Sequence, residues 1–219
     1  MWYKVKRIMV WDKQVRPYKF NPTSNTIAYF PFENDTLDHS GNWVSLSISW
    51  SFTKWTLWYV FSSSTSWQGV TFTNWNVAYM WLWFKINSTS NNTTVLNYAK
   101  RWYMAYQPTH NDSNLNNKIV NFTSSSYAIW GSIAWFTYQQ WHHLAFLYDG
   151  TKLKVAKDWV LQDFYNGTWY NFGNGITICS CGFSWNINTN VSDVIVENRA
   201  WTADEILNYY KHTKSQYWL

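Results

Sequence analysis

The sequence predicts an all-β fold: a two-sheet antiparallel β-sandwich of the jelly-roll type, with a short C-terminal helix and a small N-terminal hairpin. Many short apolar segments are separated by turn residues, which is the spacing of sandwich strands. Asn, Ser and Thr are abundant while glutamate is scarce, a balance that suits polar turns better than helices. With 219 residues, 47% of them hydrophobic, the chain can fill the core of one such domain.

The expected strands are short runs rich in β-branched and aromatic residues. In chain order they are TIAYFPF, WVSLSIS, TLWYVF, VAYMWLWFKI, TVLNYA, KIVNFT, AIWGSIA, HHLAFLYD, KLKVAK, VLQDF, GITICSC and DVIVENRA. One helix is expected after the last strand, because Thr202 and Glu205 have the spacing of a capping box. Ile206, Leu207 and Tyr210 then form its apolar face, which we expect to pack at the edge of the sandwich.

The chain divides into two parts. Residues 1–22 predict a strand-turn-strand attachment segment, with KVKRIMV and KQVRPYKF on either side of a turn at Trp11. Residues 23–219 predict the jelly-roll domain. The N-terminus lacks the apolar region of a secretory signal, and no apolar run is long enough to span a membrane.

Charge and cysteine usage exclude several classes of function. The net charge of +5 comes from scattered basic residues rather than a basic stripe, so we expect no nucleic-acid partner and no membrane insertion. Cys179 and Cys181 lie two residues apart in an expected strand, near the outer limit of disulfide geometry. We expect two buried free thiols, and no zinc site, because no further cysteine is present.

The tryptophans conflict with the predicted turns. KDWVLQ, residues 157–162, lies between two expected strands, so the chain must reverse over Asp158 and Trp159. Such a tight turn needs positive φ, which glycine tolerates and an aromatic residue does not. HSGNWVS, FTNWNVA, YNGTWYNFG and FSWNINTN, which contains Trp185, also place tryptophan among turn residues.

Nineteen tryptophans against eight glycines inverts the usual order of these residues. We hypothesise UGA-glycine recoding: some bacterial lineages and their phages read UGA as glycine, other codes read it as tryptophan, and many of these tryptophans are glycines in the natural protein. Trp83 and Trp141, in apolar strand segments, look native. The alternative is a genuinely tryptophan-rich surface, whose exposed rings could stack on sugars.

Three motifs, kept in order, carry a resemblance to a known family. Residues 38–42 give D-x-S-G-N, residues 141–150 give W-H-H followed by D-G, and residues 193–205 give an N-R-A strand end leading into a helix. The matching positions are Asp38, His39, Ser40, Gly41, Asn42, Trp141, His142, His143, Asp149, Gly150, Asp193, Asn198, Arg199, Ala200 and Glu205. Over about residues 26–212 the chain resembles the laminin-G-like family of concanavalin A-like jelly rolls, of the lectin-glucanase kind. It departs from the family at Trp159, where the family has glycine.

The resemblance implies a calcium ion as a possible cofactor, because related domains often bind one. The candidate metal ligands are Asp38, Asn42 and Asp193, with Asp35 behind them, since calcium prefers carboxylate and amide oxygens. The alternative is that Asp38 and Asn42 only stabilise the Ser-Gly turn through Asx-type hydrogen bonds. The sequence does not indicate which residues would bind a ligand.

We expect no catalytic residues. Jelly-roll glycoside hydrolases carry E-x-D-x-x-E on one strand, whereas residues 33–38 read E-x-D-x-x-D and run into a turn, which we expect to be a loop. His142 and His143 are adjacent and should face opposite sides of a strand, one hydrogen-bonded in the core and one exposed.

The resemblance therefore implies a non-enzymatic binding or structural module. Because the N-terminal segment looks like those preceding such domains in phage structural proteins, we expect a virion or tail-associated location. The expected partners are a glycan or host-surface protein, and other virion subunits bound through residues 1–22, with a homo-oligomer possible. The alternatives are a glycoside hydrolase of this class and a bacterial surface adhesin, which would be extracellular or at the cell surface.

Overall fold

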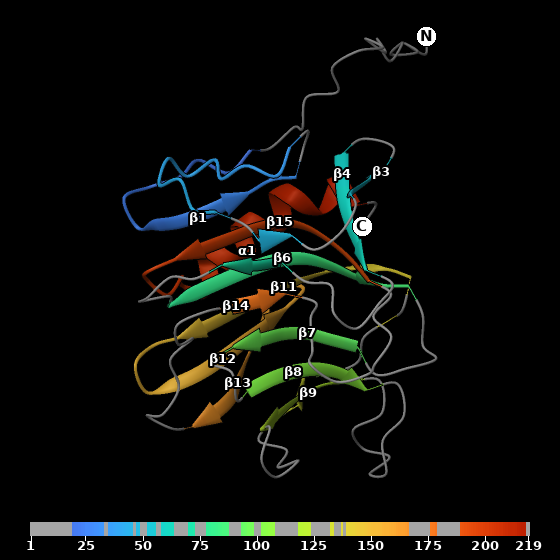
Figure 1. Ribbon diagram of the computed structural model, residues 1–219. Coiled ribbons are helices and arrows are strands. Elements are labelled where there is room, and N and C mark those ends of the chain that lie inside the picture. Colours follow the sequence, from blue (N-terminus) through green and yellow to red (C-terminus); the bar gives the residue numbers. More distant parts are fainter. Residues whose placement is uncertain are drawn as a thin grey trace, which may run out of the picture.

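A computed structural model describes most of the predicted domain (Figure 1). The described residues are 19–32, 35–45, 47–48, 52–55, 58–63, 70–72, 78–87, 93–98, 102–107, 118–123, 132–133, 137, 139–166, 176–178 and 189–217. The two cysteines, Trp185, Glu33 and residues 1–18 of the attachment segment lie outside them. The turn predicted at Trp11 and the division at residue 22 therefore stay predictions.

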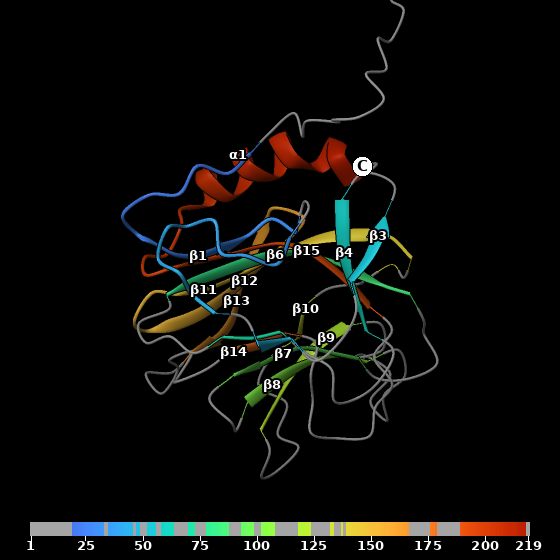
Figure 2. The same ribbon diagram turned by 45° about the horizontal axis from the view of Figure 1, so that its top comes forward.

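The described strands form two antiparallel sheets that lie over one another (Figures 1 and 2). The eight-stranded sheet runs in the order β13-β12-β11-β6-β15-β4-β3, and β1 also pairs with β15. Its strands are β1 (Thr26–Phe30), β3 (Phe52–Trp55), β4 (Trp58–Ser63), β6 (Tyr79–Ile86), β11 (Trp141–Tyr148), β12 (Lys152–Lys157), β13 (Val160–Asn166) and β15 (Thr189–Glu197). The all-β sandwich predicted from the sequence is confirmed.

The second sheet has seven strands in the order β10-β9-β8-β7-β14-β5-β2. They are β2 (Ser47–Ile48), β5 (Val70–Phe72), β7 (Thr93–Tyr98), β8 (Trp102–Gln107), β9 (Lys118–Thr123), β10 (Ser132–Ile133) and β14 (Ile176–Ile178). β3, β5 and β8 were not among the predicted strands, whereas the other strands overlap the predicted segments.

The central strand β6 explains why its sequence is apolar almost throughout. Tyr79, Trp81 and Trp83 point to the face that packs against the C-terminal helix, where they join the buried cluster. Met80, Leu82 and Phe84 alternate with them and are also fully buried. A strand covered on both faces needs no polar alternation, because neither face meets water.

The helix α1 (Ala203–Thr213) begins at the predicted capping box. The Thr202 side chain accepts the Glu205 backbone N–H, and the Glu205 carboxylate accepts the Thr202 N–H. The prediction that it packs at the sandwich edge is wrong: it lies across the outer face of the eight-stranded sheet (Figure 2). The rings of β6 form a broad apolar surface there, and Ile206 and Tyr209 cover it.

The short 3-10 helix η2 (Lys214–Tyr217) continues α1 and extends the same layer. The Tyr217 ring stacks on Trp83 with centroids 4.1 Å apart and an interplanar angle of 18°. At the other end, Phe20 is buried against Tyr29 and Trp201, so the apolar packing of the domain includes a residue of the predicted attachment segment. In the described part of the chain, no helix has the length and apolar character needed to cross a membrane.

Candidate functional site

The loop after β1 contains the first two candidate metal ligands, and Asp38 organises it. Its Oδ1 accepts backbone N–H groups from Tyr29 and Ser40 at 3.0 and 2.9 Å. Its Oδ2 accepts the Val44 N–H at 2.9 Å and the Ser40 hydroxyl at 2.8 Å. Both carboxylate oxygens therefore bind donors of the protein itself, and they fix the loop to the strand it follows.

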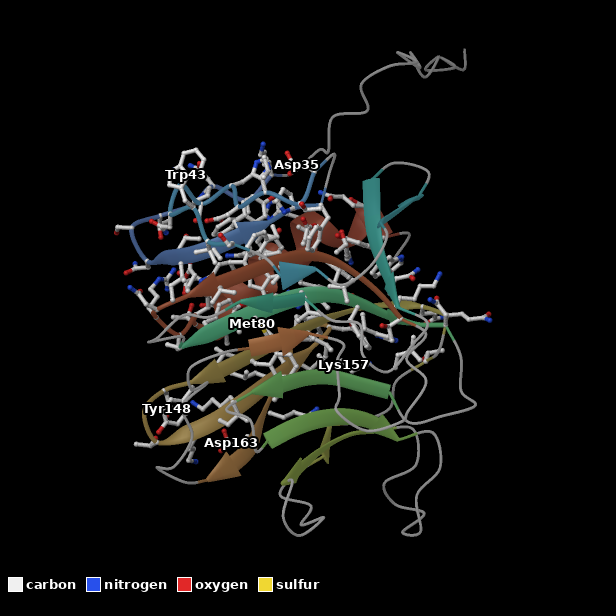
Figure 3. All side chains as sticks on the ribbon, viewed as in Figure 1. Asp35, Trp43, Met80, Tyr148, Lys157 and Asp163 are labelled. Carbon is white, nitrogen blue, oxygen red and sulfur yellow. The ribbon has the colours of Figure 1, made fainter. Side chains whose placement is uncertain are left out.

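Asn42 and Asp35 also hold this loop in place. The Asn42 side-chain amide donates to the carbonyl oxygens of Thr26 and Ile27, at 2.6 and 3.1 Å. Asp35 accepts the Leu37 N–H at 3.1 Å and lies 3.0 Å from the His39 ring nitrogen Nε2. Of the loop predicted for residues 33–38, residues 35–38 are described and lie outside any strand, as expected. Figure 3 shows Asp35 and Trp43 at the outer rim of this loop.

Asp193, the third candidate, lies inside the protein on β15. Its φ is +49° at a register shift of the strand, and its side chain is almost fully buried. The Tyr217 hydroxyl donates to its Oδ2 at 2.7 Å, which ties the strand to the 3-10 helix. Asp193 is thus directed into the helix-side layer, whereas Asp38 and Asn42 bind β1 backbone.

These three residues do not fit a calcium ion as they stand. Calcium needs several oxygens that converge on one point. Here the Asp38 oxygens accept N–H and O–H donors, and Asp193 accepts a tyrosine hydroxyl. Within the described ranges, no three His, Cys, Asp or Glu side chains come together as a metal ion requires. The Asx-type hydrogen bonds of the alternative interpretation are present, and calcium binding stays a prediction.

The two adjacent histidines differ from the expectation. Neither is exposed: His142 and His143 are both buried. His142 Nδ1 donates to Asp158 Oδ2 at 2.7 Å, and its Nε2 lies 3.1 Å from the Thr137 carbonyl oxygen. The acidic partner of His142 is Asp158, the first turn residue of KDWVLQ, which lies alongside because β12 pairs with β11.

Asp158 closes this small network. Its Oδ1 accepts the His143 N–H at 2.9 Å, and its own N–H donates to the His143 carbonyl at the same distance. Burial alone would raise the pKa of its carboxyl, but the hydrogen bond and charge of His142, together with the nearby Lys157, hold that pKa below its ordinary value. The carboxylate is therefore ionised, and it holds the turn to β11.

His143 occupies an aromatic layer between the sheet and α1. Its ring lies 5.4 Å from the rings of Trp81 and Trp83, and 6.0–6.3 Å from those of Tyr209 and Tyr210. Neither of its ring nitrogens has a hydrogen-bond partner. Burial lowers the pKa of His143 to about 4, although the charge of Asp158 acts in the opposite direction. His143 is therefore a neutral core residue at physiological pH.

The acidic and basic residues of the third motif join the last strand to the helix. Arg199 binds both Glu205 oxygens, from Nη1 at 3.0 Å and from Nη2 at 2.7 Å. That hydrogen bond and the capping bonds, against a smaller effect of burial, lower the pKa of Glu205 to about 2. On the buried side, Glu197 accepts the Thr26 hydroxyl at 3.1 Å and the Trp201 indole N–H. These motif residues therefore have structural roles.

The fold described above is a two-sheet antiparallel β-sandwich, and solved structures share it. The binding domain of botulinum neurotoxin DC, in its complexes with SialylT and with rat synaptotagmin II, is similar with a TM-score of 0.64 and 14% identity over 85% of this chain. The Trypanosoma rangeli sialidase in complex with sialic acid is similar with a TM-score of 0.66 and 11% identity over 89% of this chain.

The chain spans about half the length of the neurotoxin domains, 51%, and 34% of the sialidase chain. At these identities the likeness concerns the fold. No family model matches the sequence, and no curated protein matches it.

Proposed function

We propose that this protein is a non-enzymatic binding module of the laminin-G-like, concanavalin A-like class, which displays a carbohydrate- or host-surface-binding jelly roll. The observation that carries the proposal is the likeness, over 85% of this chain, to domains named for binding and solved with SialylT and with synaptotagmin II. Fold alone does not establish function, so this step is an analogy.

The chemistry of the motif residues supports binding rather than hydrolysis. Glycoside hydrolysis needs two carboxylates about 5–10 Å apart on either side of the scissile bond. Asp38 and Asp158 instead accept backbone N–H groups, and Glu205 is held by Arg199 and the helix cap. Carboxylates bound in this way serve the fold, so Asp38, Asp158 and Glu205 are not available as a nucleophile or acid.

The finer proposal is a location on a phage particle, with residues 1–22 adding a strand to a neighbouring subunit. It rests on the resemblance of the N-terminal sequence to the short segments that precede such domains in phage structural proteins. Deletion of residues 1–18, which keeps the buried Phe20, should then abolish incorporation into the particle while leaving the melting temperature of the domain unchanged. Normal incorporation of the shortened protein would refute the attachment role.

The experiment for the binding function is a glycan array probed with the purified full-length chain. We expect retention on a subset of glycans, with sialylated glycans as the first probes, because two similar structures hold SialylT and sialic acid. Failure to bind any glycan or any host-cell surface would refute the proposal.

A glycoside hydrolase is the second candidate, favoured by the likeness to the sialidase. It is tested on the same glycans by measuring released free sugar. Binding without release supports the binding module, whereas release that continues with time establishes the hydrolase. An adhesin on a bacterial surface differs from a virion protein in its location, which immunogold labelling of cells and particles distinguishes.

A further inference from the structure

The tryptophans with described side chains fall into two structural classes. They are Trp43, Trp81, Trp83, Trp141, Trp159 and Trp201. Trp43 and Trp159 combine positive φ, +57° and +73°, with exposed side chains, 90% and 47%. The others are buried, and none of them is among the described residues with positive φ.

At Trp159 the backbone conformation is imposed by the hairpin. Lys157 pairs with Val160, so Asp158 and Trp159 alone reverse the chain. Their φ angles, +48° and +73°, have the signs of a type I′ turn, whose second position is normally glycine. Asp158 is anchored to β11 through His142 and the His143 backbone, so the turn cannot relax to a conformation that suits tryptophan.

At Trp43 the neighbours on both sides impose the conformation. The Asn42 side chain is bound to the carbonyls of β1, and the Val44 N–H is bound to the Asp38 carboxylate. Between these two anchors residue 43 must turn with positive φ, as the neighbouring Gly41 does at +90°. The Trp43 ring extends into solvent (Figure 3), so burial of the ring does not offset the cost of positive φ.

Positive φ alone does not define this class. Phe32 has a φ of +53°, but its ring is fully buried against Phe30, so packing offsets the strain. Asp193, at +49°, is of a residue type that tolerates this region, and its carboxylate binds Tyr217. Trp43 and Trp159 have a similarly unfavourable positive φ, but their side chains are exposed and do not offset its cost.

The buried tryptophans, in contrast, have side chains that pack in the core. Trp83 stacks on the rings of Tyr217 and Tyr210, with centroids 4.1 and 5.9 Å away. Trp201 stacks on Tyr79 at 4.9 Å, and its indole N–H binds Glu197. Glycine at either position would open a cavity the size of an indole ring in the helix-side layer.

We propose that positions 43 and 159 are glycines in the natural protein, encoded by UGA and inserted by a glycyl-tRNA that reads this codon, whereas 83 and 201 are true tryptophans encoded by UGG. The composition of the chain indicates that many tryptophans are glycines in the natural protein. The φ angles and the burial of the side chains identify which of the described tryptophans these are. The natural protein then lacks both exposed rings, so its glycan-binding surface cannot consist of Trp43 or Trp159.

The direct test reads the four codons in the gene and the same positions in the protein from its natural source, by peptide mass spectrometry. We expect UGA and glycine at 43 and 159, with peptides lighter by one indolylmethyl side chain, and UGG and tryptophan at 83 and 201. UGG or tryptophan at 43 and 159 would overturn the proposal, and so would UGA and glycine at 83.

Recombinant variants of the full chain, made in a host that reads the standard code, give a second readout. Trp43→Gly and Trp159→Gly should each raise the melting temperature by about 2–4 °C, because each removes the strain of a bulky residue at positive φ. The control Trp83→Gly should lower it or prevent folding. A fall in melting temperature for both exposed-site variants would contradict the assignment, independently of whether any glycan binds.

Discussion

The His142 imidazole and the Asp158 carboxylate are joined by a 2.7 Å hydrogen bond between Nδ1 and Oδ2. This bond links β11 to the tight turn between β12 and β13, although sixteen residues separate the two in sequence. Asp158 is the first residue of this turn. The bond to His142 and the bond from the His143 N–H to Oδ1 together anchor the turn to the sheet.

Asp158→Ala should destabilise the protein by about 2–3 kcal/mol, because two buried donors lose a charged acceptor and alanine disfavours positive φ. Asp158→Asn is the matched control: asparagine tolerates the same φ and can still accept the His143 N–H, so the loss should be about 1 kcal/mol. Urea unfolding measures both. Equal losses for the two variants would show that the conformational preference and the His143 bond contribute nothing.

His143 should make the protein less stable in acid. Its pKa is about 4 in the folded protein and about 6.5 in an unfolded chain, so acid protonates the unfolded state first. The stabilisation from the neutral ring is complete above pH 6.5 and is lost as the pH falls towards 4, by about 3 kcal/mol in total. Unfolding free energies at a series of pH values measure this loss.

His143→Phe provides the comparison for this pH dependence. Phenylalanine suits the aromatic layer and cannot be protonated, so the difference between the two proteins should be constant above pH 7 and should change between pH 6.5 and 4. Identical pH profiles would show that His143 is not buried as a neutral ring.

The parts of the fold that depend on local chemistry were predictable from the sequence. The two-residue turn at Asp158 and Trp159 follows from the spacing of two strand patterns, and the capping box at Thr202 and Glu205 follows from residue types three apart. Strong apolar runs gave β6 and β11 for the same reason. RWYMAYQ, which contains β8, is rich in aromatic residues and could have been recognised.

The remaining features depend on contacts between distant segments. Whether α1 packs on an edge or a face is decided by the rings of β6, more than a hundred residues away. His142 is buried because Asp158 supplies an acceptor, and strand pairing alone brings the two together. For the same reason the motif acids could be mistaken for metal ligands: sequence shows the carboxylates but not the N–H groups that bind them.

Thr202→Ala should destabilise the protein by about 1 kcal/mol, since the Glu205 N–H at the start of α1 loses its acceptor. Thr202→Ser retains the hydroxyl and is the control, with a loss of a few tenths of a kcal/mol at most. Thermal and urea unfolding both report the difference. If serine costs as much as alanine, the methyl group rather than the cap is responsible.

Calcium at millimolar concentration should leave the melting temperature unchanged. A ligand that binds only the folded state stabilises it by mass action, but here the Asp38 oxygens already accept donors from Tyr29, Ser40 and Val44. Asp38→Ala should therefore lower stability by the same amount with and without calcium, because it removes hydrogen bonds rather than a metal ligand. A calcium-dependent rise that is absent in Asp38→Ala would instead establish the metal site predicted at Asp38, Asn42 and Asp193.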